Sequence, residues 1–373
     1  MTSPNTASTP RTVALLLAGG AGTRFWPASR SLRPKQLLPL AGDVPLLAST
    51  AQRILPLLGG WGDVLVATGA HLAEATHAVL PDIAAEQMLV EPVARNTAPA
   101  IAWAAARVAR QDPDAVLMVL PSDHHVTDVE EFRRTLRAAV ASAASGVVTT
   151  VGIRPTRPET GYGYIELAEG AAMTPGVPVR ARGFVEKPDL ARAQQFLAGG
   201  RHLWNGGMFF FRARDLLAAV KAHLPAVAET LLRFDAAAAV GRDEEARVVS
   251  ALFPGMPAVS IDHGVMEHMA ELAVVPGDFG WSDIGGWQSA WELATHDAEG
   301  NAAPQGTVLV DARDNHVVDL RQDGTGRVIA LCGVDGLVVV QTDDALLVTT
   351  RARAQEVRDV VERLKSAGRS GLT

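Results

Sequence analysis

The feature that most constrains the fold of this chain is an apolar run, residues 12–18, that ends in a glycine-rich loop, residues 19–23. A wholly apolar run of this length is typical of a strand that is buried on both faces, as in a parallel sheet. Glycine allows close backbone approach, and the free N–H groups of such a loop can surround an anion. Arg24 and Lys35 place positive charge directly after the loop. Together these residues predict a strand followed by a phosphate-binding loop.

Two common phosphate-binding patterns are absent from this loop. The P-loop pattern requires Gly-Lys followed by Ser or Thr, and no such triplet follows here. The dinucleotide-binding pattern requires a third glycine at the position of Phe25. An ordinary strand-to-helix turn is the alternative, but it would not account for Arg24 and Lys35 together.

Beyond the loop, predicted helices and strands alternate. Helical spacing at 45–58, 72–79 and 100–110 alternates with apolar runs at 63–68, 87–90 and 115–120. This alternation predicts right-handed crossovers and an α/β fold, in which a mostly parallel, Rossmann-like sheet carries helices on both faces. Ligands of such sheets bind outside the carboxyl ends of the strands.

The pattern changes near Asn301, where short apolar or alternating runs are separated by Gly, Asp and Asn. These runs predict a small β domain. An amphipathic segment over 354–365 predicts a final helix. We therefore expect a disordered tail at residues 1–11, a large α/β domain at 12–297, and a β domain with a final helix at 298–373.

Composition narrows the class of protein. The chain has 373 residues, of which 48% are hydrophobic, as in a globular protein with room for two domains. Its net charge of −7 gives no general attraction to nucleic acid or to an anionic membrane. The single cysteine, Cys332, excludes an internal disulfide and suits a reducing compartment. No apolar run is long enough to span a bilayer or to serve as a signal peptide, so we expect a cytoplasmic protein.

Two aspartates occupy positions suited to a metal ion. Asp123 directly follows the predicted strand at 115–120, and Asp283 lies in a glycine-bounded turn before a predicted helix. Mg²⁺ is usually held by one or two carboxylates together with substrate phosphates. A helix cap is the alternative explanation for each aspartate.

The segment 91–97 follows another predicted strand. Guanine presents N–H donors and the acceptors O6 and N7, which Glu91, Arg95 and Asn96 could match. Thr97 fits the N-cap of the helix that follows. Capping would explain Thr97 alone, whereas a base-binding loop would explain the charged and amide side chains as well.

Further candidate residues lie in turns and at a strand end farther along the chain. Gly161 lies beside the only two tyrosines of the chain, where close approach to a sugar ring or core packing are both possible explanations. Glu186 and Lys187 end a predicted strand, and neighbours on a strand point to opposite faces, so we expect them not to pair. Asp262 could cap the helix that follows it.

The motifs resemble those of the sugar-nucleotide pyrophosphorylases, and most closely the mannose-1-phosphate guanylyltransferase branch. They occur in the family's order: GGAGTRFWPASR…PKQ (19–36), EPVARNTAPA (91–100), PSDH (121–124), TGYGYI (160–165), VEKP (185–188), WNGGMF (204–209), DHGVME (262–267) and GWSDIGGW (280–287). Phe25 departs from the leucine common elsewhere in the superfamily, and the sequence assigns it no role. The resemblance implies transfer of GMP from GTP to α-D-mannose 1-phosphate, which yields GDP-mannose and diphosphate.

The resemblance also implies roles for individual residues. The nucleotide is expected to bind Gly19, Gly20, Gly22, Thr23, Arg24, Glu91, Arg95, Asn96 and Thr97. The sugar phosphate is expected to bind Gly161, Glu186, Lys187, Asn205 and Asp262. The catalytic side chains are expected to be Arg24, Lys35 and Lys187. The Mg²⁺ ligands are expected to be Asp123 and Asp283.

Further expectations concern assembly and alternatives. The resemblance implies a left-handed β-helix at the C-terminus that makes dimer contacts, and hence a homodimer. Some members carry an additional phosphomannose isomerase domain, and this chain ends before one would fit, so we expect one activity.

Another substrate pair, such as dTTP or UTP with glucose 1-phosphate, is an alternative that the segment 91–97 disfavours. A non-catalytic regulatory homologue is disfavoured by the presence of Arg24, Lys35, Asp123 and Asp283.

Overall fold

The computed structural model describes residues 11–20, 22–269, 271–322 and 327–373. The predicted disordered tail, residues 1–11, lies outside this set except for Arg11, as does Ala21 of the glycine-rich loop. No helix in these ranges is both long and apolar enough to cross a membrane.

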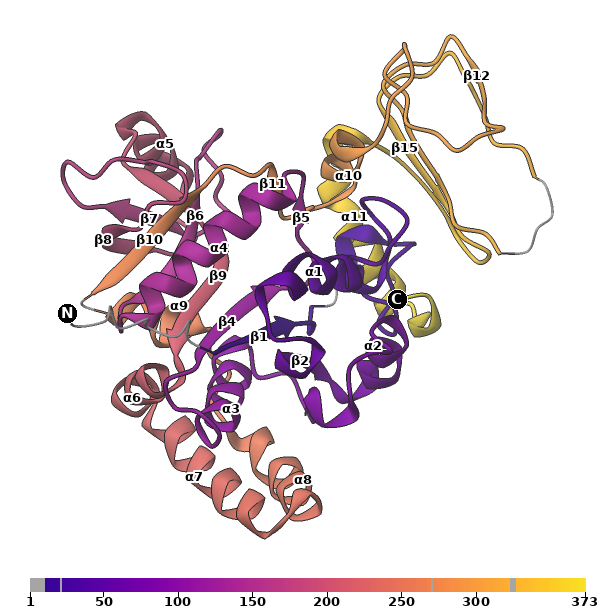
Figure 1. Cartoon of the computed structure of the whole chain (residues 1–373). Helices are drawn as coiled ribbons and strands as arrows, with labels where there is room; N and C mark the ends of the chain where they lie inside the picture. The colour runs from indigo at the N-terminus through magenta and orange to yellow at the C-terminus, as the bar shows by residue number, and fades with distance from the viewer. Residues whose placement is uncertain (1–10, 21, 270, 323–326) are drawn as a thin grey trace.

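The centre of the molecule is a nine-stranded sheet with the order β3-β2-β1-β4-β9-β6-β10-β8-β7 (Figure 1). Its strands are β1 (Thr12–Leu17), β2 (Val64–Gly69), β3 (Met88–Glu91), β4 (Val116–Pro121), β6 (Val148–Ile153), β7 (Tyr164–Leu167), β8 (Val179–Val185), β9 (His202–Arg212) and β10 (Leu272–Gly277). Within this sheet, β8 and β9 run opposite to the other strands. The predicted α/β fold with a mostly parallel sheet is confirmed.

The first strand lies inside the sheet because its side chains are apolar on both faces. β1 pairs in parallel with β2 on one side and with β4 on the other. Val13 and Leu15 belong to the core on one face, and Ala14 and Leu16 belong to the core on the other. Successive strand residues point to opposite faces, so a two-sided core requires an unbroken apolar run.

Helices cover both faces of the sheet. The core that contains Leu15 also contains residues of α3 (Thr97–Ala109), α6 (Ala213–His223), α7 (Pro225–Val240) and α8 (Arg242–Leu252). The core that contains Leu16 is packed by α1 (Leu46–Ile54), α2 (Ala73–Val79), α4 (Val129–Ala144) and α5 (Leu190–Gly199). These helices leave the carboxyl ends of the parallel strands to the loops that carry the motifs.

The C-terminal region forms the predicted small β domain and final helix, set off from the sheet beyond α10 (Trp287–Leu293) in Figure 1. Its strands are β12 (Val308–Val310), β13 (His316–Asp319), β14 (Ala330–Cys332), β15 (Leu337–Gln341) and β16 (Leu346–Thr350). β12 pairs in parallel with β14, and β13 with β15, whereas β16 returns antiparallel to β15. The helix α11 (Val357–Ser366) follows. The left-handed twist and the dimer contacts stay predictions.

A third apolar core, here called the interdomain cluster, joins the sheet region to the C-terminal region. It contains Phe25, Trp26, Leu38, Ile284, Trp287, Val338, Val340, Val357 and Val361, among others. Trp287 packs edge-on against Phe25 with ring centroids 5.1 Å apart, and its Nε1 donates a hydrogen bond to the backbone oxygen of Trp26 at 3.1 Å. Phe25, which the sequence assigned no role, is therefore an anchor for the segment that carries Arg24.

Candidate active site

Two short strands bring the two candidate metal ligands together. β5 (His125–Val126) follows Asp123, and β11 (Trp281–Ser282) precedes Asp283, and the two strands pair antiparallel. Nε1 of Trp281 also donates a hydrogen bond to Nδ1 of His124 at 3.1 Å. This pairing carries Asp283 to the carboxyl end of β4, where Asp123 lies.

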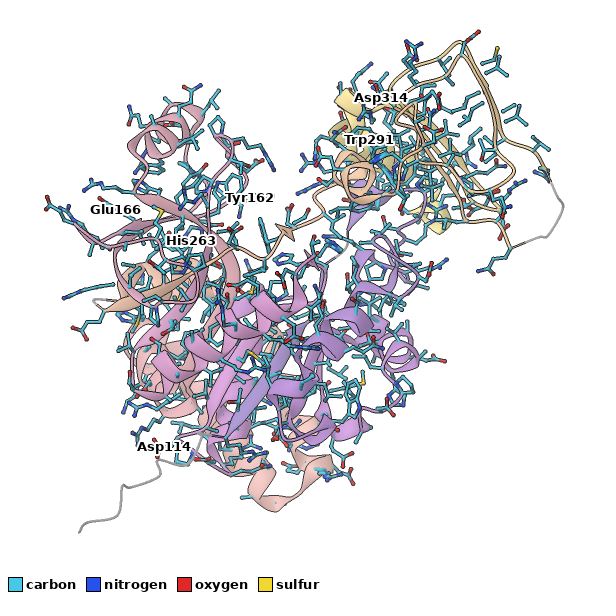
Figure 2. All side chains as sticks on the ribbon, turned by 45° about the horizontal axis from the view of Figure 1, so that its top comes forward. Asp114, Tyr162, Glu166, His263, Trp291 and Asp314 are labelled. Atoms are coloured by element: carbon cyan, nitrogen blue, oxygen red, sulfur yellow. The ribbon has the colours of Figure 1, made fainter. Side chains whose placement is uncertain are left out.

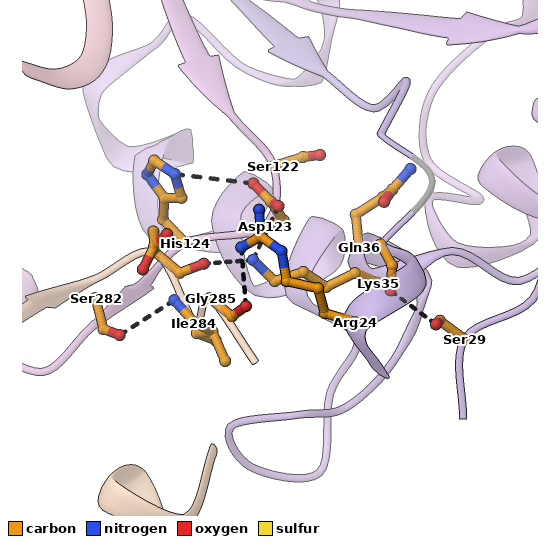
Figure 3. A network of polar contacts seen from close by, with 12 residues as sticks. Arg24, Ser29, Lys35, Gln36, Ser122, Asp123, His124, Ser282, Ile284 and Gly285 are labelled. Atoms are coloured by element: carbon orange, nitrogen blue, oxygen red, sulfur yellow. Dashed lines mark hydrogen bonds and ion pairs between the residues drawn. The ribbon is translucent and has the colours of Figure 1, made fainter. Parts of the chain in front are cut away.

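Lys35 is the central cation of the site (Figure 3). Its Nζ donates a hydrogen bond to Asp123 Oδ2 at 2.9 Å and another to the backbone oxygen of Asp283. The Lys35 side chain is 8% exposed, against 36% for Asp123. Burial acts to raise the pKa of Asp123, but the charges of Lys35 and His124 and the hydrogen bond from Lys35 outweigh it and hold this pKa below its usual range. Asp123 is therefore a carboxylate at neutral pH.

The carboxylate of Asp283 is held by a tyrosine. The hydroxyl of Tyr162, a residue labelled in Figure 2, donates a hydrogen bond to Asp283 Oδ1 at 2.6 Å. Burial and the negative charge of Asp283 raise the pKa of Tyr162, so it remains a donor. Sequence reasoning considered a sugar contact or core packing for the two tyrosines and missed this hydrogen bond.

The glycine-rich loop packs tightly against Lys35. Gly22 has a left-handed backbone with φ of 57°, and a Cβ there would lie 2.5 Å from Cβ of Lys35. Only glycine fits this position without displacing the lysine. Ser29 Oγ donates to the backbone oxygen of Gly22 at 2.7 Å, and Arg24 Nη1 donates to the backbone oxygen of Gly285 at 2.9 Å. The loop, Arg24 and Lys35 are thus fixed as one unit.

These residues line a pocket of about 350 Å³, here called the phosphate pocket. Its lining includes Gly22, Thr23, Arg24, Lys35, Asp123, His124, Asp283, Gly285 and Arg358. Arg358 comes from α11 in the C-terminal region, and sequence reasoning missed it because the helical pattern there gave no sign of a site. The pocket therefore combines cationic side chains with two carboxylates.

The two carboxylates fit a divalent cation. The Asp123 carboxylate and the backbone oxygen of Asp283 both accept a hydrogen bond from Lys35, and the Asp283 carboxylate, which accepts one from Tyr162, belongs to a residue that lines the same pocket. Among the described residues, no cluster of three or more His, Cys, Asp or Glu side chains could hold a metal ion. A pair of carboxylates beside a phosphate site suits Mg²⁺, which fills its remaining positions with substrate oxygens and water.

A second pocket of about 450 Å³, the nucleoside pocket, adjoins the first at Asp123. Its lining brings together most of the predicted nucleotide residues with Asp262, namely Gly19, Gly20, Glu91, Arg95, Asn96 and Thr97. The carboxyl ends of β1, β3 and β4 contribute to this lining, as the fold class predicted. The sequence-predicted phosphate and base residues are thus brought to two adjoining pockets.

The prediction that Thr97 is the N-cap of helix α3 is wrong. Asn96, not Thr97, is the N-cap of α3, and its Oδ1 accepts a hydrogen bond from the Thr97 N–H at 2.9 Å. Asn96 has φ of 62°, a left-handed conformation that asparagine tolerates better than threonine. Thr97 Oγ1 instead accepts a hydrogen bond from the N–H of Ile261 at 2.9 Å. Arg95 donates to the backbone oxygen of Pro254.

Glu91 is the buried acid of the nucleoside pocket. It is 8% exposed, and burial raises its pKa from 4.5 to about 7. Burial penalises the charged form of the Glu91 carboxyl. Its neutral form therefore contributes fully to the stability of the fold below pH 4.5, and this contribution is lost as the pH rises through about 7.

Glu91→Gln is therefore expected to stabilise the free protein at pH 8 by up to about 3 kcal/mol and to change little at pH 4.5. Urea unfolding at both pH values measures this difference. Glu74→Gln, on the exposed side of α2, is the matched control and should have no effect at either pH. Equal stability of the Glu91→Gln and unmodified proteins at pH 8 would contradict a buried charged carboxylate.

The predicted sugar residues form a smaller cluster. Asn205 Nδ2 donates to Asp262 Oδ1 at 2.9 Å. Burial, assisted by the charge of Glu186, raises the pKa of Asp262 to about 6. Ser260 caps the short helix α9 (Ile261–Gly264), so the capping role considered for Asp262 is wrong. Gly161 makes a different contact, in which its N–H donates to Glu159 Oε1 at 3.0 Å.

The prediction that Glu186 and Lys187 do not pair is also wrong. Lys187 Nζ donates to Glu186 Oε1 at 2.7 Å. β8 ends at Val185, and Lys187 has φ of 46°, so the alternation of side chains along a strand no longer applies. Gly163 packs against this acid, because a Cβ there would lie 2.5 Å from Glu186 Oε2.

Known protein families match both regions of the chain. Residues 13–300 match the family model described as nucleotidyl transferase, and residues 306–364 match the one described as a MannoseP isomerase/GMP-like β-helix domain. The chain belongs to the nucleotidyl transferase family. The phosphate pocket of this nucleotidyl transferase lies within the first match, apart from Arg358, which belongs to the matched β-helix domain.

Proteins similar to this nucleotidyl transferase match it along almost its whole length. The xanthan biosynthesis protein XanB of Xanthomonas campestris is 41% identical over 361 residues, which are 96% of this chain and 74% of that protein. The mannose-1-phosphate guanylyltransferase of Escherichia coli is 40% identical over 362 residues, 95% of this chain and 74% of that protein. A crystal structure from Thermus thermophilus, of a protein named mannose-1-phosphate geranyltransferase, has a TM-score of 0.82 at 36% identity and covers 95% of this chain and 99% of its own. The resemblance stated from the motifs is confirmed.

Proposed function

We propose that this nucleotidyl transferase is a mannose-1-phosphate guanylyltransferase, which forms GDP-mannose and diphosphate from GTP and α-D-mannose 1-phosphate. The proposal is carried by one observation: Arg24, Lys35, Asp123 and Asp283 line the phosphate pocket, and this pocket adjoins the nucleoside pocket, which contains residues 91–97. The 40% identity to the E. coli mannose-1-phosphate guanylyltransferase supports the choice of substrates.

The proposed reaction is a direct in-line displacement. An oxygen of the sugar phosphate bonds to the α-phosphorus of GTP, and the bond from that phosphorus to the bridging oxygen of diphosphate breaks. The attacking oxygen is already anionic, so no side chain must act as a nucleophile or general base. Catalysis then rests on positioning and on neutralising the negative charge of the phosphates.

Each cationic side chain has a place in this scheme. Arg24, with the N–H groups of residues 19–23, holds the β- and γ-phosphates and stabilises the departing diphosphate. Lys35 neutralises charge at the α-phosphate, and Lys187 holds the incoming sugar phosphate. Mg²⁺, held by Asp123 and Asp283, would supply further charge neutralisation and orient the phosphate oxygens.

Base and sugar recognition are assigned to the buried polar groups. Glu91, ionised above its pKa of about 7, can accept hydrogen bonds from the N1–H and N2–H₂ donors of guanine. The other residues assigned to the base are Arg95, Asn96 and Thr97, which line the same pocket. Glu186, Asn205 and Asp262 are assigned to the sugar hydroxyls, with Gly161 in the turn that adjoins the ring.

Diphosphate release tests the substrates. Four nucleoside triphosphates are each combined with mannose 1-phosphate and with glucose 1-phosphate, in the presence of Mg²⁺. We expect release with GTP and mannose 1-phosphate to exceed every other pair. Preference for another pair would keep the chemistry but overturn the assignment of residues 91–97, and no release with any pair would overturn the proposal.

Arg24→Ala is expected to lower kcat by about 10²–10³-fold, because one preorganised contact to the departing diphosphate is lost. Steady-state kinetics measure the change. Arg30→Ala removes an arginine of the same segment that pairs with Asp344 outside the pocket, and it should keep kcat within about threefold. Arg24→Ala with kcat equal to that of Arg30→Ala would remove Arg24 from the mechanism.

We also propose a cytoplasmic homodimer, with residues 298–373 making the dimer contacts. The single cysteine suits a reducing compartment, and the net charge of −7 disfavours nucleic acid or a membrane as a partner. Sedimentation equilibrium tests the dimer.

A further inference from the structure

The helix α11 of the C-terminal region is held against the segment that carries Arg24. It packs on the short helix η1 (Thr23–Phe25), near the N-terminal segment drawn in indigo in Figure 1. Beyond α11, the backbone oxygen of Leu372 accepts a hydrogen bond from Trp26 Nε1 at 2.7 Å. Packing and this hydrogen bond therefore fix where α11 lies relative to the phosphate pocket.

Arg358 lies next to the buried face of α11. Val357 and Val361 are each 2% exposed and belong to the interdomain cluster with Phe25. Successive residues of a helix are turned by about 100°, so Arg358 lies at the edge of this buried face. Arg358 is exposed and lines the phosphate pocket together with Arg24. The C-terminal region thus contributes a guanidinium group to the pocket proposed for the triphosphate.

The acids that line the phosphate pocket are bound by groups other than Arg358. The carboxylate of Asp123 accepts a hydrogen bond from Lys35 at 2.9 Å, and that of Asp283 accepts one from Tyr162 at 2.6 Å. The Arg358 guanidinium makes no hydrogen bond or ion pair with any residue in the described ranges. It is therefore available to an anion that enters the pocket.

Neighbouring acids on the same helix are also bound elsewhere. Glu356 pairs with Arg353, and Glu362 pairs with Lys365 at 2.9 Å. Glu362 lies four residues after Arg358, at the spacing at which opposite charges on a helix commonly pair. That pair is not formed, because Glu362 is turned to Lys365. The position of Arg358 is thus explained better by the pocket than by a surface ion pair.

The arrangement of the two pockets indicates which phosphates Arg358 can reach. The phosphate pocket adjoins the nucleoside pocket at Asp123, whereas Arg24 and Arg358 line the phosphate pocket and not the nucleoside pocket. In a nucleotide that extends from one pocket into the other, the α-phosphate is nearest the nucleoside and the outer phosphates lie beyond it. An arginine fork pairs with phosphate oxygens through two parallel hydrogen bonds.

We propose that Arg358 binds the β- and γ-phosphates of the nucleoside triphosphate together with Arg24, so that the C-terminal region completes the nucleotide site. This inference rests on the proposed function and adds a residue to it. When the bond to the α-phosphorus breaks, both arginines stay with the departing diphosphate. A nucleoside monophosphate has no group at this position, so its binding does not depend on Arg358.

Calorimetric titration with GTP and, separately, with GMP, each with Mg²⁺, tests the assignment. Arg358→Met is expected to bind GTP at least about tenfold more weakly than the unmodified protein, as expected for a lost charged hydrogen bond. Its affinity for GMP should stay within about twofold. Equal losses of affinity for GTP and GMP would overturn the assignment of Arg358 to the outer phosphates.

Arg363→Met is the matched control. It removes an exposed arginine from the same helix, at a residue that does not line the pocket. This variant should bind GTP within about twofold of the unmodified protein. Because Arg358 and Arg363 are both exposed, both variants should keep the thermal midpoint. Equal affinities of the two variants for GTP would overturn the role of Arg358.

Inorganic triphosphate with Mg²⁺ separates this inference from the proposed function. It has neither base nor sugar, so its binding does not depend on the assignment of guanine or mannose. The same tenfold difference between Arg358→Met and Arg363→Met is expected with it. Equal binding of triphosphate by the two variants would overturn the role of Arg358 alone, whereas the substrates are judged by diphosphate release from the unmodified protein.

Discussion

Lys35→Met is expected to lower kcat by about 10²–10³-fold or more, the largest loss of activity that a single substitution should cause here. Lys35 contacts both aspartates of the phosphate pocket, with Nζ 2.9 Å from Asp123 Oδ2 and hydrogen-bonded to the Asp283 backbone. Its loss removes the cation proposed to neutralise the α-phosphate and leaves the Asp123 carboxylate without its ion-pair partner. KM for GTP should change less than kcat, because the charge at the α-phosphate grows during the reaction.

The control for this variant is Lys221→Met, which removes an exposed lysine on α6. It should leave kcat unchanged. Circular dichroism and the thermal midpoint of both variants show whether the fold is retained. A folded Lys35→Met protein with kcat within about threefold of Lys221→Met would contradict the role given to Lys35.

Trp287→Ala is expected to lower the free energy of unfolding by about 3–5 kcal/mol. Trp287 is 1% exposed, packs on Phe25 and donates to the Trp26 backbone, so its truncation opens a cavity in the interdomain cluster. That cluster also receives Val357 and Val361 of α11. Because Arg24 adjoins Phe25, kcat should fall as well, even though Trp287 lies outside the phosphate pocket.

Trp287→Phe is the matched variant for this prediction. It keeps an aromatic ring against Phe25 but loses the hydrogen bond to Trp26, so about half of the destabilisation or less is expected. Urea unfolding measures both variants. A loss below about 1 kcal/mol for Trp287→Ala would show that the C-terminal region does not support the loop.

Local patterns in the sequence predicted the elements well. The helix predicted at 72–79 corresponds to α2 (Ala73–Val79), and the strands predicted at 12–18, 63–68, 87–90 and 115–120 differ from β1, β2, β3 and β4 by one residue at their ends. The short runs after residue 300 correspond to β12–β16. Such elements are predictable because side-chain period and apolar run length reflect the face that each element buries.

Contacts at turns were harder to predict. The capping role given to Thr97 belongs to Asn96, and Glu186 pairs with Lys187 although strand geometry argued against it. In both cases a residue with positive φ, at positions 96 and 187, changes the direction of the chain. Composition and periodicity do not report this backbone change.

The sequence by itself determined the buried first strand, the glycine-rich loop with its cations, and the residue types of the site, because these features follow from neighbouring residues. Only the tertiary structure decided that Lys35 contacts Asp123 and the backbone of Asp283 (Figure 3), that Arg358 joins the phosphate pocket, and that Phe25 packs on Trp287. These contacts join segments that are far apart in the sequence. They form through the pairing of β5 with β11 and through the interdomain cluster, and both depend on packing of the whole chain rather than on any local pattern.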